Sequence, residues 1–164
     1  MEKYISAFST NLCQMKISIE RADISCLDTI AGFQVQMARE TENLHLDMPT
    51  VLKGVRHIFQ NPGTGHYKIA LHEGEIVASL LVLYEWSDWR NGNVLWIHSV
   101  YVLPQYRGKG IFSQMYAQLK EEVLQTSALI GLRLYVDKTN GSARNVYRKL
   151  GMTDQHYDLF EWMP

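Results

Sequence analysis

Apolar and polar residues follow two periods along this chain, and each period predicts a type of element. Alternation, or a short apolar run, predicts strands at Gln14–Glu20, Tyr67–His72, Ile76–Tyr84, Val94–Leu103, Leu129–Val136 and Tyr157–Trp162. Helical spacing predicts helices that begin near Asp23, Asp47 or Thr50, Ile111, and Asn140 or Ser142. The order is β-α-α-β-β-β-α-β-α-β, within one domain over residues 14–164 that follows a lead-in at residues 1–13.

Turn residues separate several of these elements. Glu73-Gly74-Glu75 and Asn91-Gly92 are typical of hairpin turns. Gly151 predicts the end of the last helix. The strand, helix and strand between Val94 and Val136 predict a parallel pair joined by a right-handed crossover.

The stretch from Asn93 to Lys120 contains the clearest candidate chemistry. Pro104 ends a strand, and the loop Gln105–Gly110 leads directly into a helix. Gly108 and Gly110 permit backbone angles closed to other residues and let a ligand approach the main chain. The N–H groups that begin the helix, and its dipole, favour an anion, and Arg107 and Lys109 add positive charge. The loop therefore predicts a phosphate or pyrophosphate ligand.

Two common phosphate motifs do not fit this loop. No Walker loop exists in the chain, and the third glycine of a dinucleotide fingerprint is replaced by Ser113. The loop instead resembles that of the GCN5-related N-acetyltransferases, whose pattern is Gln or Arg, two residues, Gly, one residue, and Gly or Ala. Gln105, Gly108 and Gly110 match this pattern, whereas the frame that starts at Arg107 departs from it at Phe112. The strand before Pro104 and the run from Asn140 to Met152 are also similar to family motifs.

This resemblance covers nearly all of residues 14–164 and implies a fold and an activity. The implied fold is α/β (α+β), with a mixed, mostly antiparallel central sheet, a parallel strand pair at the cofactor site and helices on both faces. The implied activity is acetyl-CoA-dependent transfer of an acetyl group to a primary amine of a small molecule or peptide. The resemblance places the cofactor against Val100, Val102, Gln105, Arg107, Gly108, Lys109, Gly110, Ile111, Phe112 and Asn140.

Acetyl transfer needs a neutral amine, an oxyanion contact and a proton for the departing thiolate. A backbone N–H between Val100 and Val102 is the candidate oxyanion contact. Tyr147 matches the tyrosine that the family uses as general acid, so the resemblance also implies that it contacts the cofactor. The alternative is a tyrosine that only packs in the core. Some relatives carry a glutamate base on the central strand, which here has no acid. His98, which alternation places on one face with Trp96, Val100 and Val102, is a candidate base or a core histidine.

The acceptor side rests on the segment Glu85–Trp89. Glu85, Trp86, Asp88 and Trp89 combine acids with indoles, which suits a cationic amine through charge and cation–π contact. Glu85 is also a candidate base, directly or through water. The alternative is a hydrated hairpin loop whose indoles pack on the sheet.

Composition narrows the classes further. The chain has 164 residues, 46% hydrophobic and 20% charged, with a net charge of −1, which gives no sign of a nucleic-acid or membrane surface. Two cysteines, Cys13 and Cys26, are too few for a disulfide framework, and the absence of a targeting segment favours the cytoplasm. The scattered histidines predict no metal site. Two other functions remain open: a non-catalytic acyl-CoA-binding domain, and a nucleotide-binding module, against which the missing Walker and dinucleotide patterns count. A homodimer is also open.

Overall fold

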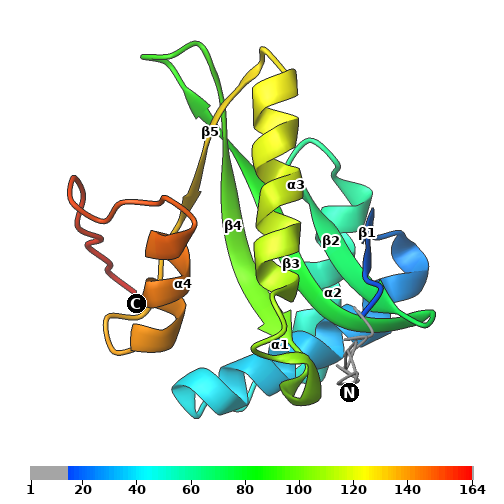
Figure 1. Cartoon of the computed structure of the whole chain (residues 1–164). Helices are drawn as coiled ribbons and strands as arrows, with labels where there is room; N and C mark the ends of the chain where they lie inside the picture. The colour runs from blue at the N-terminus through cyan, green and yellow to red at the C-terminus, as the bar shows by residue number, and fades with distance from the viewer. Residues whose placement is uncertain (1–14, 164) are drawn as a thin grey trace, which may run out of the picture.

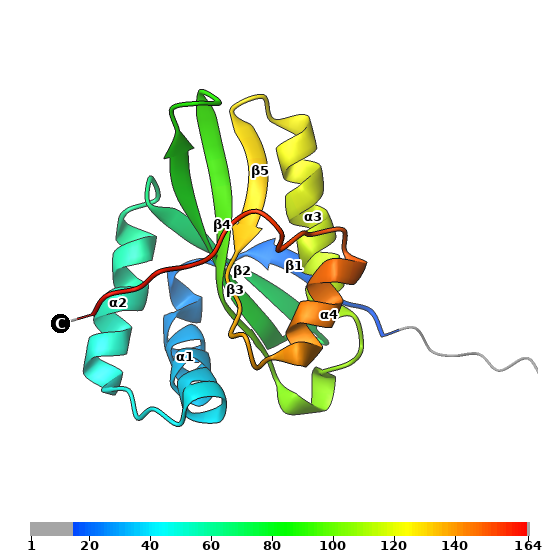
Figure 2. The same cartoon turned by 90° about the vertical axis from the view of Figure 1, so that its left-hand side faces the viewer.

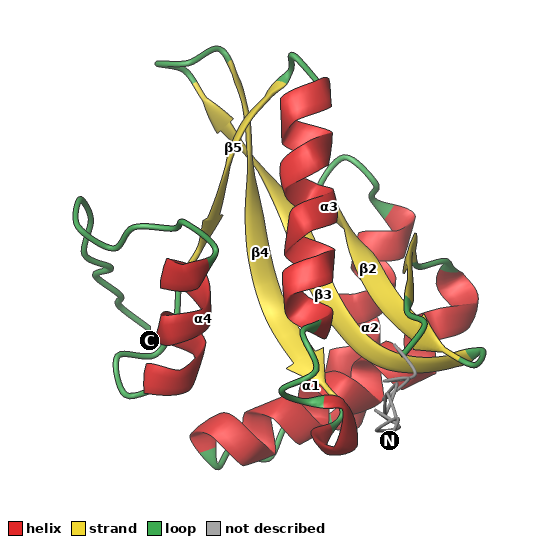
Figure 3. Ribbon diagram, viewed as in Figure 1, coloured by secondary structure: helices red, strands yellow, loops and turns green. Residues whose placement is uncertain are grey.

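The computed structural model describes residues 15–163, so the lead-in predicted at residues 1–13 lies outside the described residues. A five-stranded sheet in the order β1-β2-β3-β4-β5 forms its centre (Figures 1 and 3). Neighbouring strands are antiparallel except for β4 and β5, which are parallel. The strands are β1 Ser18–Arg21, β2 Gly65–His72, β3 Glu75–Ser87, β4 Gly92–Val102 and β5 Leu129–Leu134.

Helices cover both faces of this sheet, as Figure 2 shows. One face carries α1 Leu27–Glu42 and α2 Met48–Gln60, and the other carries α3 Ile111–Gln125 and α4 Gly141–Lys149. The mixed sheet, the parallel pair and the two helical layers confirm the predicted fold class. Across residues 15–163, none of the helices combines the length and apolar character needed to cross a bilayer.

Side-chain caps begin the helices where the sequence predicts them. The Asp47 carboxylate accepts a hydrogen bond from the Thr50 N–H at 2.9 Å at the start of α2. The Asn140 side chain accepts from the Ala143 N–H at 3.0 Å at the start of α4. Asp23 caps a short 3₁₀ helix, Ile24–Cys26, that runs into α1. Gly151 ends α4 with φ +86°.

Two apolar layers hold the sheet. Ile111, Met115 and Leu119 of α3 pack on one face, and each is at most 2% exposed. Burying a side chain of this size contributes about 1.5–3 kcal/mol, so the beginning of α3 is firmly fixed to the sheet. Ile30, Ala31 and Val55 form the corresponding layer between α1, α2 and the opposite face.

The strand predicted at Tyr157–Trp162 is wrong. These residues have no regular structure, and Tyr157 and Phe160 are 77% and 93% exposed. Their alternation is that of a strand, but a strand needs a partner, and β5 is the edge of the sheet in the described residues. The segment after α4 crosses from the α3–α4 side to the α1–α2 side of the molecule instead (Figure 2).

The strands at both ends of the sheet are shorter than predicted. β1 begins at Ser18 rather than at Gln14, because pairing with β2 starts at Ser18 opposite Leu71. Gln14 itself lies outside the described residues. β5 ends at Leu134 rather than at Val136, because its pairing with β4 stops there.

Candidate active site

The glycine loop connects β4 to α3 by way of a 3₁₀ turn, Pro104–Tyr106. Gly108 and Gly110 have φ values of +72° and +75°, in the left-handed region that favours glycine. A Cβ added at either position would meet no atom within 4 Å. Backbone conformation, rather than crowding by this chain, is therefore what requires glycine at both positions.

A run of unpaired backbone N–H donors extends from the glycine loop into the first turn of α3. The first backbone bond of α3 runs from the Gln114 N–H to the Gly110 carbonyl at 3.1 Å. Within residues 15–163, no backbone or side-chain acceptor receives a hydrogen bond from any N–H group of residues 108–113. Six successive free N–H groups at a helix start, where the dipole is positive, form a place for an anion.

Two positively charged side chains belong to the loop, and only one of them forms an ion pair in the described residues. The Lys109 ammonium lies 5.2 Å from the centre of the Tyr106 ring, and in the described residues no carboxylate forms an ion pair with it. The Arg107 guanidinium donates to Glu40 Oε2 at 2.6 Å. Lys109 and the helix dipole therefore supply the uncompensated positive potential at this loop.

A β-bulge in β4 changes which residues share a face. Tyr101 pairs with Ser79 and His98 pairs with Leu81, so Ser99 and Val100 together oppose the single residue between Ser79 and Leu81. Ser99 adopts φ +49°, as the extra residue of such a bulge does.

The prediction that His98 shares a face with Val100 and Val102 is therefore wrong. Val100 and Val102 pack toward α3, in the same apolar layer as Leu95 and Ile97. His98 stays with Trp96 on the other face, where the two ring centres are 5.9 Å apart. The inserted residue reverses the alternation of side chains along the strand.

Beyond this bulge, β4 has main-chain groups that pair with no strand formed by residues 15–163. The parallel pairing of β4 with β5 ends at Ile97 opposite Leu134. The Leu103 N–H donates to the Val77 carbonyl of β3 at 2.9 Å, so by alternation Val100 and Val102 direct their N–H and C=O groups away from β3. This open edge leads from the end of the β4–β5 pairing to the glycine loop.

Tyr147 lies close to the start of α3. Its ring contacts that of Phe112 edge to face, with the centres 5.4 Å apart, and Phe112 is the second residue of α3. Burial raises the pKa of the Tyr147 phenol, which keeps it protonated at neutral pH. Asn140 uses its side-chain oxygen as a helix cap, which leaves its amide NH₂ group as the part able to contact a ligand.

Three aromatic rings gather where β4 and β5 separate, on the face opposite α3. We call Trp96, His98 and Tyr135 the aromatic array. The His98 and Tyr135 ring centres are 5.2 Å apart, and His98 Nδ1 lies 3.2 Å from the Tyr135 hydroxyl. Burial lowers the pKa of His98, so its imidazole is neutral at pH 7. A neutral imidazole beside an open strand edge can accept a proton.

Glu85 borders the aromatic array. The other three residues of the predicted acceptor segment, Trp86, Asp88 and Trp89, lie at the tip of the β3–β4 hairpin. Glu85 accepts from Arg133 Nη1 at 2.7 Å and from the Trp96 indole N–H. Trp86 and Trp89 are 58% and 86% exposed, and Asp88 accepts from the N–H of Trp89.

The structure does not bring this hairpin tip to the glycine loop. Trp86 pairs with Asn93 at the beginning of β4. Val100 follows Asn93 by seven residues, which is about 23 Å along a strand. Glu85 is the member of this segment that is hydrogen-bonded to the aromatic array, through the Trp96 indole.

Three residues of the candidate site, Tyr135, Arg133 and Glu40, are not predicted from the sequence. Tyr135 joins His98 only because β5 pairs with β4 in one register, with Arg133 opposite Trp96. Arg133 itself lies 5.8 Å from the centre of the Trp96 ring. Glu40 reaches Arg107 across 67 residues of sequence. No local pattern marks contacts of this kind.

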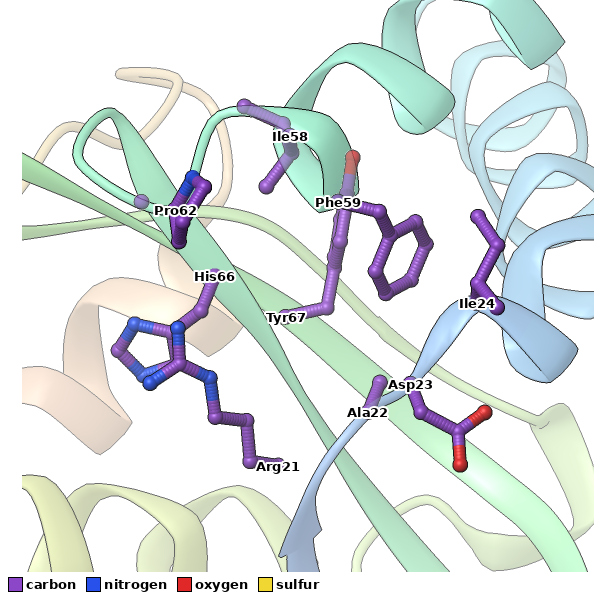
Figure 4. A pocket seen from close by; sticks show the side chains of 10 residues that line it. Arg21, Ala22, Asp23, Ile24, Ile58, Phe59, Pro62, His66 and Tyr67 are labelled. Carbon is purple, nitrogen blue, oxygen red and sulfur yellow. The ribbon is translucent and has the colours of Figure 1, made fainter.

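A cavity of about 220 Å³ lies elsewhere in the molecule, between the beginning of β2 and the end of α2 (Figure 4). Arg21, His66, Phe59 and Tyr67 contribute to its walls. β2, however, begins at the end of the sheet opposite to where β4 ends. Since the glycine loop follows the end of β4, we place the candidate active site there and not in this cavity. In the described residues, no three His, Cys, Asp or Glu side chains gather as ligands of a metal ion would.

Comparison with known proteins identifies the family of this arrangement. The model of the Acetyltransferase (GNAT) family matches residues 33–152. A solved structure, "a possible acetyltransferase from Clostridium difficile 630", is 40% identical, with a TM-score of 0.84 over 90% of this chain and 97% of that chain. A predicted acetyltransferase from Clostridium acetobutylicum, solved with acetyl-CoA, shares the fold at 19% identity and a TM-score of 0.69, over 88% and 96% of the two chains.

Curated relatives match over a shorter stretch. The thialysine N-epsilon-acetyltransferase of Mus musculus is 36% identical over 86 residues, which is 49% of this chain and 49% of the relative. That of Bos taurus is 33% identical over 79 residues, which is 48% of this chain and 45% of the relative. The chain thus spans about half the length of these curated relatives.

Proposed function

The chain belongs to the Acetyltransferase (GNAT) family, and from this premise we propose that it transfers an acetyl group from acetyl-CoA to a primary amine. The single observation that carries the proposal is the run of six free N–H groups at residues 108–113. A pyrophosphate supplies the acceptor oxygens that such a run of donors lacks.

The chain's own residues fit acetyl-CoA along one continuous edge. The loop N–H groups and Lys109 would hold the pyrophosphate, with Gln105 beside them. The N–H and C=O groups of Val100 and the N–H group of Val102, which face away from β3, would bond to the amides of the pantetheine arm, as an added strand does. The Val102 carbonyl already accepts a hydrogen bond from Arg107. When bound, acetyl-CoA supplies an acetyl group activated as a thioester.

Two titratable side chains flank this edge from opposite faces. His98, on the α1–α2 face, would take the proton of the incoming ammonium group on Nε2, provided that its Nδ1–H donates to the Tyr135 oxygen. Tyr147, on the α3–α4 face, would give its phenolic proton to the departing sulfur. An N–H group at Val100 or Val102 would stabilise the developing oxyanion.

The acceptor amine would bind against the aromatic array. Trp96, His98 and Tyr135 offer ring faces, and Glu85 has both carboxylate oxygens engaged by Arg133 and Trp96. Stacking and cation–π contact therefore contribute more here than a free carboxylate does. The relatives named for thialysine act on a primary amine, which supports this acceptor class.

The second candidate is a non-catalytic acyl-CoA-binding domain of the same fold. A neutral His98 on one face of the sheet and a protonated Tyr147 on the other support an enzyme, since a sensor needs neither group.

Thiol release from acetyl-CoA, measured across a library of primary amines, tests the proposal. We expect amine-dependent release that requires Tyr147, with no release when the amine is omitted. Tight acetyl-CoA binding without release for any amine would favour the binding domain, and no acetyl-CoA binding would exclude both.

A further inference from the structure

The Arg107 side chain is fixed by this chain before any ligand arrives. Its Nη2 donates to Glu40 Oε2 at 2.6 Å, and its Nε donates to the Val102 carbonyl at 2.8 Å. Its guanidinium carbon lies 5.3 Å from the centre of the Tyr101 ring. The edge of the guanidinium that carries Nε and Nη2 is thus engaged, and the charge of the group is balanced by a carboxylate.

Glu40 is in turn held by a buried tyrosine. The Tyr101 hydroxyl donates to Glu40 Oε1 at 2.8 Å, and Tyr101 is only 3% exposed. Its ring packs against Phe33 of α1, with the centres 5.1 Å apart. Hydrogen bonds from Arg107 and then from Tyr101 lower the pKa of Glu40, which therefore stays ionised. The contacts join α1, the last residues of β4 and the first part of the glycine loop.

Arg107, although exposed, is the last side chain before the two glycines that is held by hydrogen bonds to this chain. Gly108, Lys109 and Gly110 are exposed, and the next buried side chain is Ile111 at the start of α3. The free N–H groups therefore lie between two fixed points, Arg107 on one side and Ile111 on the other.

We propose that Glu40, Tyr101 and Arg107 form a positioning cluster that holds the glycine loop in its anion-binding conformation, and that Arg107 is not itself a phosphate ligand. The ligand in this inference rests on the proposed function. Holding the loop in advance lowers the conformational entropy lost when a ligand binds. A phosphate that used the remaining donors of Arg107 would meet a guanidinium whose charge Glu40 already balances.

The two roles of Arg107 predict opposite signs for one substitution. Glu40→Ala frees the guanidinium. If Arg107 were a phosphate ligand, its release would leave CoA affinity unchanged or tighten it. If the cluster positions the loop, the same change weakens CoA binding by about tenfold, the factor that corresponds to 1.4 kcal/mol.

A second pair of variants separates charge from geometry. Arg107→Lys keeps the positive charge but loses the planar fork that contacts Glu40 and Val102 together. Under the proposal, Arg107→Lys weakens CoA binding as much as Arg107→Met does, and neither adds to Glu40→Ala in the double variant. An Arg107→Lys variant that binds like the parent while Arg107→Met does not would identify Arg107 as a charge for the phosphates and overturn the proposal.

Calorimetric titration with CoA measures these affinities, with Glu122→Ala as the matched control. Glu122 pairs with Lys68 at 3.4 Å, and its side chain is 36% exposed, against 37% for Glu40. This pair lies between α3 and β2, away from the loop, so we expect parental affinity. Circular dichroism melting curves confirm that each variant is folded.

A ligand-free readout keeps the test independent of the proposed function. In native-state digestion with trypsin, Glu40→Ala should speed cleavage after Lys109 about three- to tenfold, because the loop opens more often. Failure of the parent to bind CoA would remove the proposed function and leave this digestion to decide the inference. An unchanged cleavage rate, or CoA affinity in Glu40→Ala equal to or tighter than the parental value, would overturn the positioning role.

Discussion

The glycine loop and the aromatic array lie near the two ends of the open edge of β4, and they differ in how their polar groups are satisfied. At the loop, six backbone N–H groups have no acceptor in the described residues. At the array, Glu85 is bonded to Arg133 and Trp96, and His98 is bonded to Tyr135. The loop can therefore bind a charged ligand through its main chain, whereas the array offers ring surfaces and one neutral base. Under the proposed function, the first region would hold the cofactor and the second would select the acceptor.

The largest effect on cofactor affinity should follow from removing the loop's donors. Gly110→Val forces a β-branched residue into φ +75°, a conformation that costs it roughly 1–2 kcal/mol. If the loop relaxes, it loses hydrogen bonds to a charged ligand worth about 1.5–3 kcal/mol each, so acetyl-CoA affinity should fall more than about a hundredfold. Calorimetry measures this loss.

Gly54→Val is the matched control for that loss. Gly54 lies in α2, has open space around it and has no positive φ, so acetyl-CoA affinity should remain parental. Equal affinity of the folded Gly110→Val variant and the parent would separate the loop from cofactor binding.

Tyr147 contacts the beginning of α3 through Phe112, and its loss should act on turnover alone. Tyr147→Phe keeps the ring contact with Phe112 and removes the phenolic proton. General acid catalysis contributes about 10²–10⁴-fold, so kcat should fall by that order while acetyl-CoA affinity is retained. Tyr116→Phe is the control, since Tyr116 is a buried α3 tyrosine, 8% exposed, with a pKa also raised by burial. Equal kcat for both variants would make Tyr147 a packing residue.

His98 should govern the acid side of the pH profile. Burial lowers its pKa below 6.5, so the parent should keep its kcat/KM from pH 7 down to about 6.5 and lose it below, as the imidazole takes up a proton. His98→Gln should lower kcat/KM by about 10²-fold and remove that acid limb. His45→Gln, in the α1–α2 connection, should leave the profile unchanged. An acid limb that survives in His98→Gln would assign the base elsewhere.

Stability must be followed over the same pH range. Burial lowers the pKa of His66 to about 4, whereas the unfolded chain titrates near 6.5. The unfolded state then binds more protons between these values, so the free energy of unfolding should decrease as pH falls from 6.5 to 4. Denaturant titrations at pH 7.0, 5.5 and 4.5 measure this decrease, and a flat result would show that His66 protonates freely in the folded protein.

The smallest effects should come from two acids, Glu85 beside the aromatic array and Asp88 at the hairpin tip. Glu85→Gln weakens a partly exposed ion pair worth about 0.2–1 kcal/mol, so the amine KM should rise about two- to fivefold with the acetyl-CoA KM unchanged. Asp88→Asn, at the hairpin tip, should change neither. Steady-state kinetics in both substrates provide the comparison. A larger effect for Asp88 than for Glu85 would restore the hairpin as the acceptor site.

The sequence predicts the loop well because residue type there determines the backbone. Glycine marks the positive φ angles of Gly108 and Gly110, and the apolar face of residues 111–123 marks α3. The bulge has no such marker in the sequence, because a serine occupies its positive φ position. Simple alternation therefore places Val100 and Val102 wrongly on the face of His98.

Contacts between distant residues account for the rest. The aromatic array depends on the register of β5 against β4, and the pairing of Arg107 with Glu40 depends on how α1 crosses the sheet. Neither follows from local periodicity. The alternation at Tyr157–Trp162 is typical of a strand, but a strand also needs a neighbour to pair with. Local sequence does not reveal whether one exists, and these residues have no such neighbour in the described part of the chain.

The assignment of cofactor binding to the loop's main chain is tested most directly by amide hydrogen exchange of the parent protein with and without saturating CoA. Exchange should slow at the amides of residues 108–113 and along Val100–Val102, while the amides of β2 around His66 stay unchanged. Unaltered exchange at residues 108–113, or protection confined to the cavity between β2 and α2, would contradict the assignment.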